Sequence, residues 1–237
     1  MVSVRKSHQM TTTSFEKWLA SLEISEAKSQ AIESLWNENK PYFKDADECV
    51  VKSFEMVEIL ASLNLDKDSL CAAFLFPLVE YQLLEMAHIE ENYSKAIFKL
   101  CVGVSQMDAI RTLQQTQSSH VASNQIDNIR KMLLAMVEDV RAVVIKLAER
   151  LCYLRIVKNA DEETRVLAAK ETANIYAPLA NRLGIGQLKW ELEDISFRYL
   201  HPDVYKQIAK LLDEKRLDRE QYMVDFVSFL SGELENA

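Results

Sequence analysis

A helical repeat of apolar residues is the strongest constraint on how this chain can fold. Between residues 126 and 154, apolar side chains recur at intervals of three and four, which places them on one face of an α-helix. The acidic pair Glu138 and Asp139 interrupts the series, so we expect two helices with a break near Asp139. The series consists of Ile126, Ile129, Leu133, Met136, Val140, Val143, Leu147, Leu151 and Leu154.

The same period continues toward the C-terminus. Asp161 is a predicted N-cap, and acidic residues follow it in the first turn of the next helix. Gly184-Ile185-Gly186 is too short for a dinucleotide fingerprint and is expected to end a helix. His201-Pro202-Asp203 should stop one helix and start another, and Asp218 with Gln221 predicts a last capped helix.

The first half of the chain predicts two buried helices. They cover residues 54–63 and 70–84, and either Asp66 or Asp68 is a suitable cap for the second. Pro77 lies inside the second segment and should kink or split it.

Composition supports a helical protein, because strands and hairpins need many turns and turns rely on Gly and Pro. The 237 residues include only 4 Gly and 4 Pro, so we expect an all-α fold with short polar loops. The formal net charge of -8 would repel phosphate backbones, which argues against nucleic-acid binding by the chain as a whole. A small basic pocket for a nucleotide stays possible.

The cysteines and the apolar runs predict a cytoplasmic protein with no membrane contact. No Cys-x-x-Cys pair occurs, and each cysteine has apolar neighbours, as is typical of reduced core cysteines. The longest apolar run, residues 71–76, is far short of the ~20 residues that a membrane span requires. No apolar signal core follows the N-terminus. The four cysteines are Cys49, Cys71, Cys101 and Cys152.

A search for catalytic chemistry finds no recognised centre. The four histidines are widely separated and none precedes an Asp, so the sequence offers no obvious metal ligand set. Lys146, Glu149 and Arg150 are three and four residues apart, which suggests either a local ion-pair set or a residual polar pocket. Glu80 could be a general base or a solvent-exposed carboxylate at a helix end.

Two stretches of the chain carry a family resemblance. One is the helical run 130–157, and the other is Ile175-Tyr-Ala-Pro-Leu-Ala-Asn-Arg-Leu-Gly-Ile-Gly-Gln-Leu-Lys-Trp-Glu-Leu-Glu-Asp, followed by Phe197-Arg-Tyr-Leu-His-Pro202. Both resemble the N-terminal hydrolase domain of the Rel/Spo family of guanosine tetra- and pentaphosphate synthetase–hydrolases. The resemblance covers residues 50–217 well and the first 45 loosely. It implies an all-α, HD-domain-like bundle of roughly 10–11 helices.

The resemblance also implies where a metal would bind. Active members of the family hydrolyse the 3′-pyrophosphate with a manganese ion held by a His, a His-Asp doublet and a distal Asp. These positions fall at Lys52, Phe76, Pro77 and Glu149. Phe76 and Pro77 offer no donor, and Lys52 would repel a cation. The resemblance therefore implies that the manganese site and hydrolysis are lost and that the chain holds no cofactor.

Further substitutions fall on neighbouring family positions. An acidic pair of the family falls at Glu80 and Tyr81, so one acid remains, and a nucleotide-contacting His-Asn falls at Cys152 and Tyr153. This pattern resembles the ribosome-associated, synthetase-only RelA-type branch, the GTP pyrophosphokinases. Their synthetase domain transfers pyrophosphate from ATP to GTP or GDP.

The resemblance implies three parts. Residues 1–45 would be a helical extension, 46–183 a degenerate HD domain, and 184–237 a helical linker toward a synthetase domain, before which the chain stops. The favoured function is regulation of that synthetase in the stringent response, with residues 191–216 as the contact. Ribosome and uncharged tRNA would bind through C-terminal domains.

Three alternatives stay open. Glu80 and Glu149 could support a residual hydrolase. Lys146, Arg150 and Arg155 could contact phosphates in a non-catalytic nucleotide sensor. The domain could also be a docking surface for a separate regulatory protein.

Overall fold

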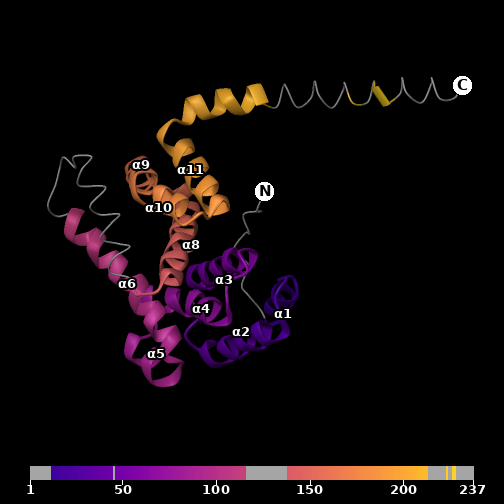
Figure 1. Ribbon diagram of the computed structural model, residues 1–237, viewed down its shortest axis with the longest axis vertical. Coiled ribbons are helices and arrows are strands. Elements are labelled where there is room, and N and C mark those ends of the chain that lie inside the picture. The colour runs from indigo at the N-terminus through magenta and orange to yellow at the C-terminus, as the bar shows by residue number, and fades with distance from the viewer. Residues whose placement is uncertain (1–11, 45, 116–137, 213–222, 224–225, 228–237) are drawn as a thin grey trace, which may run out of the picture.

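The computed structural model describes residues 12–44, 46–115, 138–212, 223 and 226–227. Within these ranges every regular element is a helix, which confirms the predicted all-α bundle (Figure 1). The helices are α1 (Thr12–Ala20), α2 (Glu26–Asn39), α3 (Asp47–Ser62), α4 (Lys67–Glu80), α5 (Met86–Asn92), α6 (Lys95–Gln115), α8 (Val140–Ile156), η1 (Val157–Asn159), α9 (Glu162–Glu171), η2 (Thr172–Tyr176), α10 (Ala177–Arg182) and α11 (Gly186–Leu200). A further helix covers residues 202–212.

The core is centred on α4, which is buried on nearly every side. Helices α2, α3, α6 and α8 all pack against it. Aromatic side chains join the N-terminal helices to this core: the Phe15 ring stacks on Trp36 at a centroid distance of 4.8 Å, and Trp18 stacks on Phe54 at 4.0 Å. Stacked pairs of this kind add to the free energy gained by burying their area. Helices α1 and α2 therefore share one hydrophobic core with α3 and α4.

Three aspartates cap helices: the sequence predicts two of these caps, at Asp161 and at Asp66 or Asp68, and only a break near Asp139. Asp66 caps α4, Asp139 caps α8 and Asp161 caps α9, and each carboxylate accepts a backbone N–H of the first turn at 2.8–3.0 Å. A cap of this kind contributes about 1 kcal/mol to helix stability. The predicted break near Asp139 is confirmed where α8 begins. The predicted helix before it, and the cap at Asp218, lie outside the described residues.

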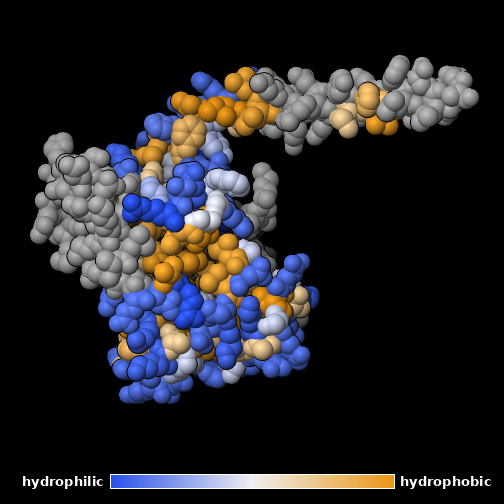
Figure 2. Space-filling model, viewed as in Figure 1, coloured by the Kyte–Doolittle hydropathy of each residue, from blue (hydrophilic) through white to orange (hydrophobic). Residues whose placement is uncertain are grey.

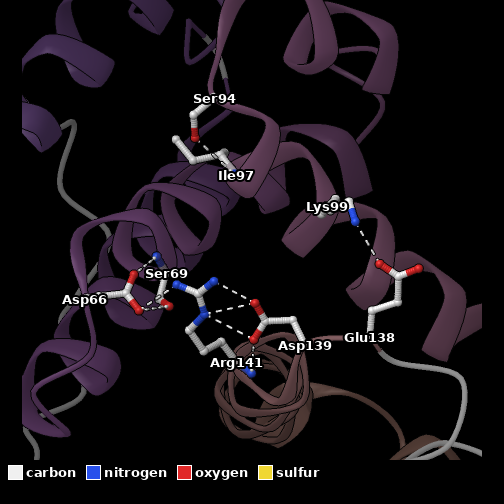
Figure 3. A network of polar contacts seen from close by, with 8 residues as sticks. All are labelled: Asp66, Ser69, Ser94, Ile97, Lys99, Glu138, Asp139 and Arg141. Atoms are coloured by element: carbon white, nitrogen blue, oxygen red, sulfur yellow. Dashed lines mark hydrogen bonds and ion pairs between the residues drawn. The ribbon is translucent and has the colours of Figure 1, made fainter.

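One arginine joins two of these caps (Figure 3). The Arg141 guanidinium lies 2.8 Å from Asp66 and 2.6 Å from Asp139, so it fixes the N-termini of α4 and α8 next to each other. Burial alone would raise the pKa of Asp66, but hydrogen bonds from Arg141 and Ser69 outweigh it and lower that pKa.

Pro77 does not split α4. The helix begins at Lys67, runs through Pro77 and ends at Glu80, so the predicted helix 70–84 begins three residues late and ends four residues late. Pro77 lies in the last turn, where it removes only one intrahelical N–H, and its carbonyl still accepts the N–H of Tyr81 at 2.9 Å. Gln82 then adopts a left-handed φ of 58°, which turns the chain away from the helix.

A single π-helical turn joins α9 to α10. In η2 the N–H of Ala177 donates to the carbonyl of Thr172, five residues earlier. Such turns insert one extra residue into a helix and occur often at functional sites. The chain then ends α10 as predicted: Gly184 has a φ of 72°, and the N–H of Ile185 donates to the carbonyl of Ala180 at 3.0 Å. This is the Schellman geometry that glycine permits.

Helix 202–212 follows α11 after a bend at His201, as predicted, and leads away from the bundle (Figure 1). Its apolar side chains are solvent-exposed, and Figure 2 shows them along this helix. We call them the apolar stripe: Val204, Ile208, Leu211 and Leu212, which are 43–58% exposed. No helix among the described residues is long and apolar enough to cross a membrane.

Candidate functional site

Four charged side chains from three helices meet inside the bundle, and we call them the ion-pair cluster. Lys52 lies on α3, Glu80 on α4, and Lys146 and Glu149 on α8. The Lys52 Nζ lies 2.6 Å and 2.8 Å from the two Glu80 oxygens and 2.8 Å from Glu149 Oε1. The Lys146 Nζ lies 2.6 Å from Glu149 Oε2. The cluster therefore holds two ammonium groups and two carboxylates, with no net charge.

The cluster is buried at one end and open at the other. The side chains of Lys52, Lys146 and Glu149 are at most 4% exposed, whereas Glu80 is 34% exposed. Ions removed from water in this way require paired partners, because desolvation costs several kcal/mol for each ion. The pairing explains how three charged groups remain inside an apolar core.

Burial and pairing act on these pKa values in opposite directions. Burial would raise the pKa of Glu149, but the ammonium groups of Lys146 and Lys52 outweigh it and lower that pKa far below its usual range. Burial would lower the pKa of Lys52, yet Glu149 and Glu80 raise it. Burial and then the charge of Glu149 raise the pKa of Glu80, against the opposing effect of Lys52.

This donor set does not fit a manganese ion. The position between the two carboxylates is taken by the Lys52 ammonium, and both Phe76 and Pro77 are buried in α4 without a donor atom. Among the residues that the structure describes, no group of three or more His, Cys, Asp or Glu side chains is spaced to hold an ion. Manganese requires several oxygen or imidazole donors, and here only two carboxylates converge.

Arg150 is directed away from the cluster, although it is four residues from Lys146. Its guanidinium donates to the Thr172 hydroxyl at 3.1 Å, the Ala168 carbonyl at 3.2 Å and Glu171 at 2.5 Å. It also lies over two aromatic rings, Tyr153 at 4.8 Å and Tyr176 at 5.1 Å. Arg150 is 1% exposed and therefore fixes α8 to α9 and the π-helical turn.

Arg155 also has partners within the fold. Its guanidinium lies 2.7 Å from Glu191 on α11 and 4.0 Å from Glu55 on α3, and its side chain is 17% exposed. Cys152 is fully buried, and burial raises the pKa of its thiol well above the usual range. Tyr81 is 37% exposed at the C-terminal end of α4, and partial burial raises its pKa.

The structure thus brings together some of the predicted site residues and separates others. Lys52, Glu80, Lys146 and Glu149 form one cluster, whereas Arg150 and Arg155 face other helices. Neither sequence interpretation of Glu80, a general base or a fully solvated carboxylate, includes its pair with Lys52. Sequence reasoning also missed the Arg150 partners on α9 and η2. No local spacing indicates them, because they lie 18–22 residues away.

Two hollows on the surface are separate from the cluster. One, of about 290 Å³, is lined mainly by apolar residues of the α3–α4 connection, α8 and the α10–α11 turn, including Leu63, Leu65 and Val144. Figure 2 shows hydrophobic side chains gathered on this face of the molecule. The other, of about 490 Å³, lies beside Lys99, Glu138 and Arg141 of the network in Figure 3. Neither is lined by a residue of the ion-pair cluster.

Known proteins resemble this chain along nearly its whole length. A GTP pyrophosphokinase of Escherichia coli K12 is 52% identical over 241 residues, which cover 99% of this chain and 32% of the relative. A GTP pyrophosphokinase of Haemophilus influenzae is 48% identical over 244 residues, which cover 99% of this chain and 33% of the relative. A probable guanosine-3′,5′-bis(diphosphate) 3′-pyrophosphohydrolase of Synechocystis is 38% identical over 177 residues, which cover 75% of this chain and 22% of the relative. Similarity therefore includes the first 45 residues more fully than the motifs alone suggest.

These relatives are longer than the chain, which spans about a third of the length of the pyrophosphokinases, so they contain additional domains. The HD-domain family model matches residues 28–186, which include most of α2, all of α3 to α10 and the whole ion-pair cluster. The expected HD-domain bundle is thus confirmed, and the chain belongs to the HD-domain family, within its RelA/SpoT type.

Proposed function

We propose that this domain is a catalytically inactive relative of the guanosine tetraphosphate hydrolases and that it regulates an adjoining GTP pyrophosphokinase domain in the stringent response. The observation that carries the proposal is the Lys52 ammonium, which lies within 2.8 Å of both Glu80 and Glu149. A positive side chain thus occupies the centre of the polar cluster at which the family resemblance implies a metal.

Loss of hydrolysis follows from the chemistry of the cluster. Attack of water on a pyrophosphate needs an activated oxygen nucleophile and a cation to stabilise the developing charge. Here Glu149 is neutralised by two ammonium groups, which weakens it as a base, and Glu80 is paired with Lys52. Phe76 and Pro77 supply no donor. The same cluster leaves no place for manganese, so the proposal includes no cofactor.

Regulation of a neighbouring domain is supported by the length of the relatives and by the apolar stripe. The relatives named GTP pyrophosphokinase are about three times as long as the matched segment. Val204, Ile208, Leu211 and Leu212 stay 43–58% exposed on helix 202–212, and exposed apolar rows of this kind mark protein contacts. Together with α11 from Glu191 onward, this helix is the proposed contact with the synthetase domain.

The proposal locates the other partners outside this chain. The negative charge of -8 disfavours direct nucleic-acid contact by this domain, so ribosome and uncharged tRNA would bind to the additional domains. A cytoplasmic location fits four free, buried cysteines and the family role. A nucleotide sensor has weaker support, because Lys146, Arg150 and Arg155 all form ion pairs within the fold.

The first test is hydrolysis. The 237-residue chain, incubated with guanosine tetraphosphate and manganese, should release no pyrophosphate above the rate of a protein-free blank. The Synechocystis relative, whose name gives it as a probable hydrolase, is the positive control. Turnover that disappears in Glu149→Gln would show that the cluster is catalytic and would contradict the proposal.

The second test is regulation. In a full-length pyrophosphokinase carrying this domain, deleting residues 1–180 should change the rate of guanosine tetraphosphate synthesis, or its stimulation by ribosomes. The double substitution Ile208→Ser with Leu211→Ser should produce part of the same change, because it removes apolar contact area without altering the bundle. Identical rates of synthesis in the full-length protein, the deletion variant and the double variant, with and without ribosomes, would rule out the regulatory role.

A further inference from the structure

We infer that Lys52 is a built-in substitute for a metal ion: its ammonium group takes the position and the charge-balancing role of a cation bound by Glu80 and Glu149. This deepens the proposed loss of hydrolysis, on which it rests, at the same cluster. It predicts that the bundle needs no metal and that the two carboxylates would bind one once an imidazole replaces the ammonium.

The contacts of Lys52 resemble those of a bound cation more than those of a surface ion pair. Its Nζ contacts three oxygens from two carboxylates at 2.6–2.8 Å, and these carboxylates lie on two different helices, α4 and α8. Lys52 itself is on α3 and is 2% exposed. One positive charge therefore holds together three helices of the core, as a structural ion does.

The two lysines of the cluster have different roles. Lys146 lies on the same helix as its partner Glu149, three residues before it, so that pair is local to α8. Lys52 reaches Glu149 across 97 residues and Glu80 across 28. Removing Lys146 would leave an ammonium between the carboxylates, whereas removing Lys52 would leave two carboxylates facing each other. Lys146 is therefore a matched control: it has the same charge and equal burial, but a different position.

The substitution Lys52→His is the informative change. An imidazole is shorter than a lysine side chain by roughly the length of a metal–nitrogen bond, about 2.1 Å. An ion bound to that imidazole would lie near the present position of Nζ, within reach of Glu80 and Glu149. The variant would thus offer one nitrogen and two carboxylate groups, which is a donor set that manganese accepts.

The experiment measures manganese binding and thermal unfolding of the 237-residue chain. Free manganese is followed by the loss of its electron paramagnetic resonance signal, in the wild type, Lys52→His and Lys146→His. The wild type and Lys146→His should bind no manganese and should unfold at the same temperature with manganese or with EDTA. Lys52→His should bind one ion and, at a manganese concentration ten times the dissociation constant, should gain about 3–6 °C in unfolding temperature.

Several results would overturn the inference. One is manganese binding by the wild type that Glu149→Gln abolishes. Another is a folded Lys52→His protein that binds no ion. If Lys52→His does not fold in EDTA, its helical structure, measured by circular dichroism, should return in manganese. Failure of Lys52→His to fold in manganese would count against the substitute role. These measurements need no hydrolysis or synthesis. The substitute role of Lys52 can therefore be contradicted while the proposed function holds, and the proposed function can be contradicted while the substitute role holds.

Discussion

The ion-pair cluster and the apolar stripe on helix 202–212 differ in how completely the domain satisfies its own chemistry. In the cluster, every charge has a partner of opposite sign, and the lysines are almost fully buried. On the stripe, four large apolar side chains stay 43–58% exposed. The contrast between a fully paired interior and an exposed apolar row supports the proposal that the domain contacts other domains through helix 202–212 and not at the position of the family's catalytic site.

The largest expected effect on stability comes from disrupting the ion-pair cluster. Glu149→Gln would leave two buried ammonium groups with one carboxylate, and we expect it to lower the free energy of unfolding by about 3–5 kcal/mol. Urea unfolding followed by circular dichroism measures the change. Glu91→Gln, the same chemical change at an exposed carboxylate on α5, is the control and should alter stability by less than about 0.5 kcal/mol. Equal effects in the two variants would mean that the cluster contributes nothing to folding.

A change of pH should sharpen the same contrast. The folded-state pKa of Glu149 is lowered, so its contribution to stability is present above the unfolded pKa of about 4.3 and is lost as pH falls through the folded value. The stability difference between the wild type and Glu149→Gln should therefore be constant near pH 6–7 and shrink below about pH 4. Urea midpoints measured for both proteins from pH 7 to pH 3 test this. A difference that grows toward acid would reverse the assigned sign.

The smallest effect on stability should come from a substitution in the apolar stripe. Ile208 is 43% exposed, so Ile208→Ser should change the free energy of unfolding by less than about 0.5 kcal/mol. The same urea titration applies, with Ile32→Ser as the contrasting variant, because Ile32 is fully buried in α2. A large loss of stability in Ile208→Ser would mean that the stripe already packs within this chain.

Local chemistry explains which parts of the fold the sequence could predict. Asp139 and Asp161 cap helices through bonds to residues two or three positions away, and Gly184 ends a helix through its own backbone freedom. Such signals can be read from short windows. Pro77 misled the prediction because the cost of a proline depends on how much helix follows it, and only three residues of α4 do.

The site was less predictable, because its contacts are not local. Position by position, the family resemblance identified Lys52, Glu80 and Glu149 as neighbours of the former metal site. It did not predict that the Lys52 ammonium would bridge both carboxylates, which lie 28 and 97 residues away in the sequence. Spacing on one helix suggested that Arg150 joins Lys146 and Glu149. Instead the Arg150 guanidinium lies against the π-helical turn, which no apolar period indicates.

The π-helical turn of η2 also sets the orientation of α10 about its own axis. An α-helix advances about 100° per residue, so one inserted residue rotates the later part of the helix by that angle relative to the earlier part. Downstream of Thr172, α10 therefore presents a different face to its neighbours from the one that an uninterrupted continuation of α9 would present. Arg150 bonds to Thr172 and lies over Tyr176, the first and last residues of the turn. The orientation of α10 about its own axis is thus set at a single buried turn, which the Arg150 guanidinium contacts from the neighbouring helix α8.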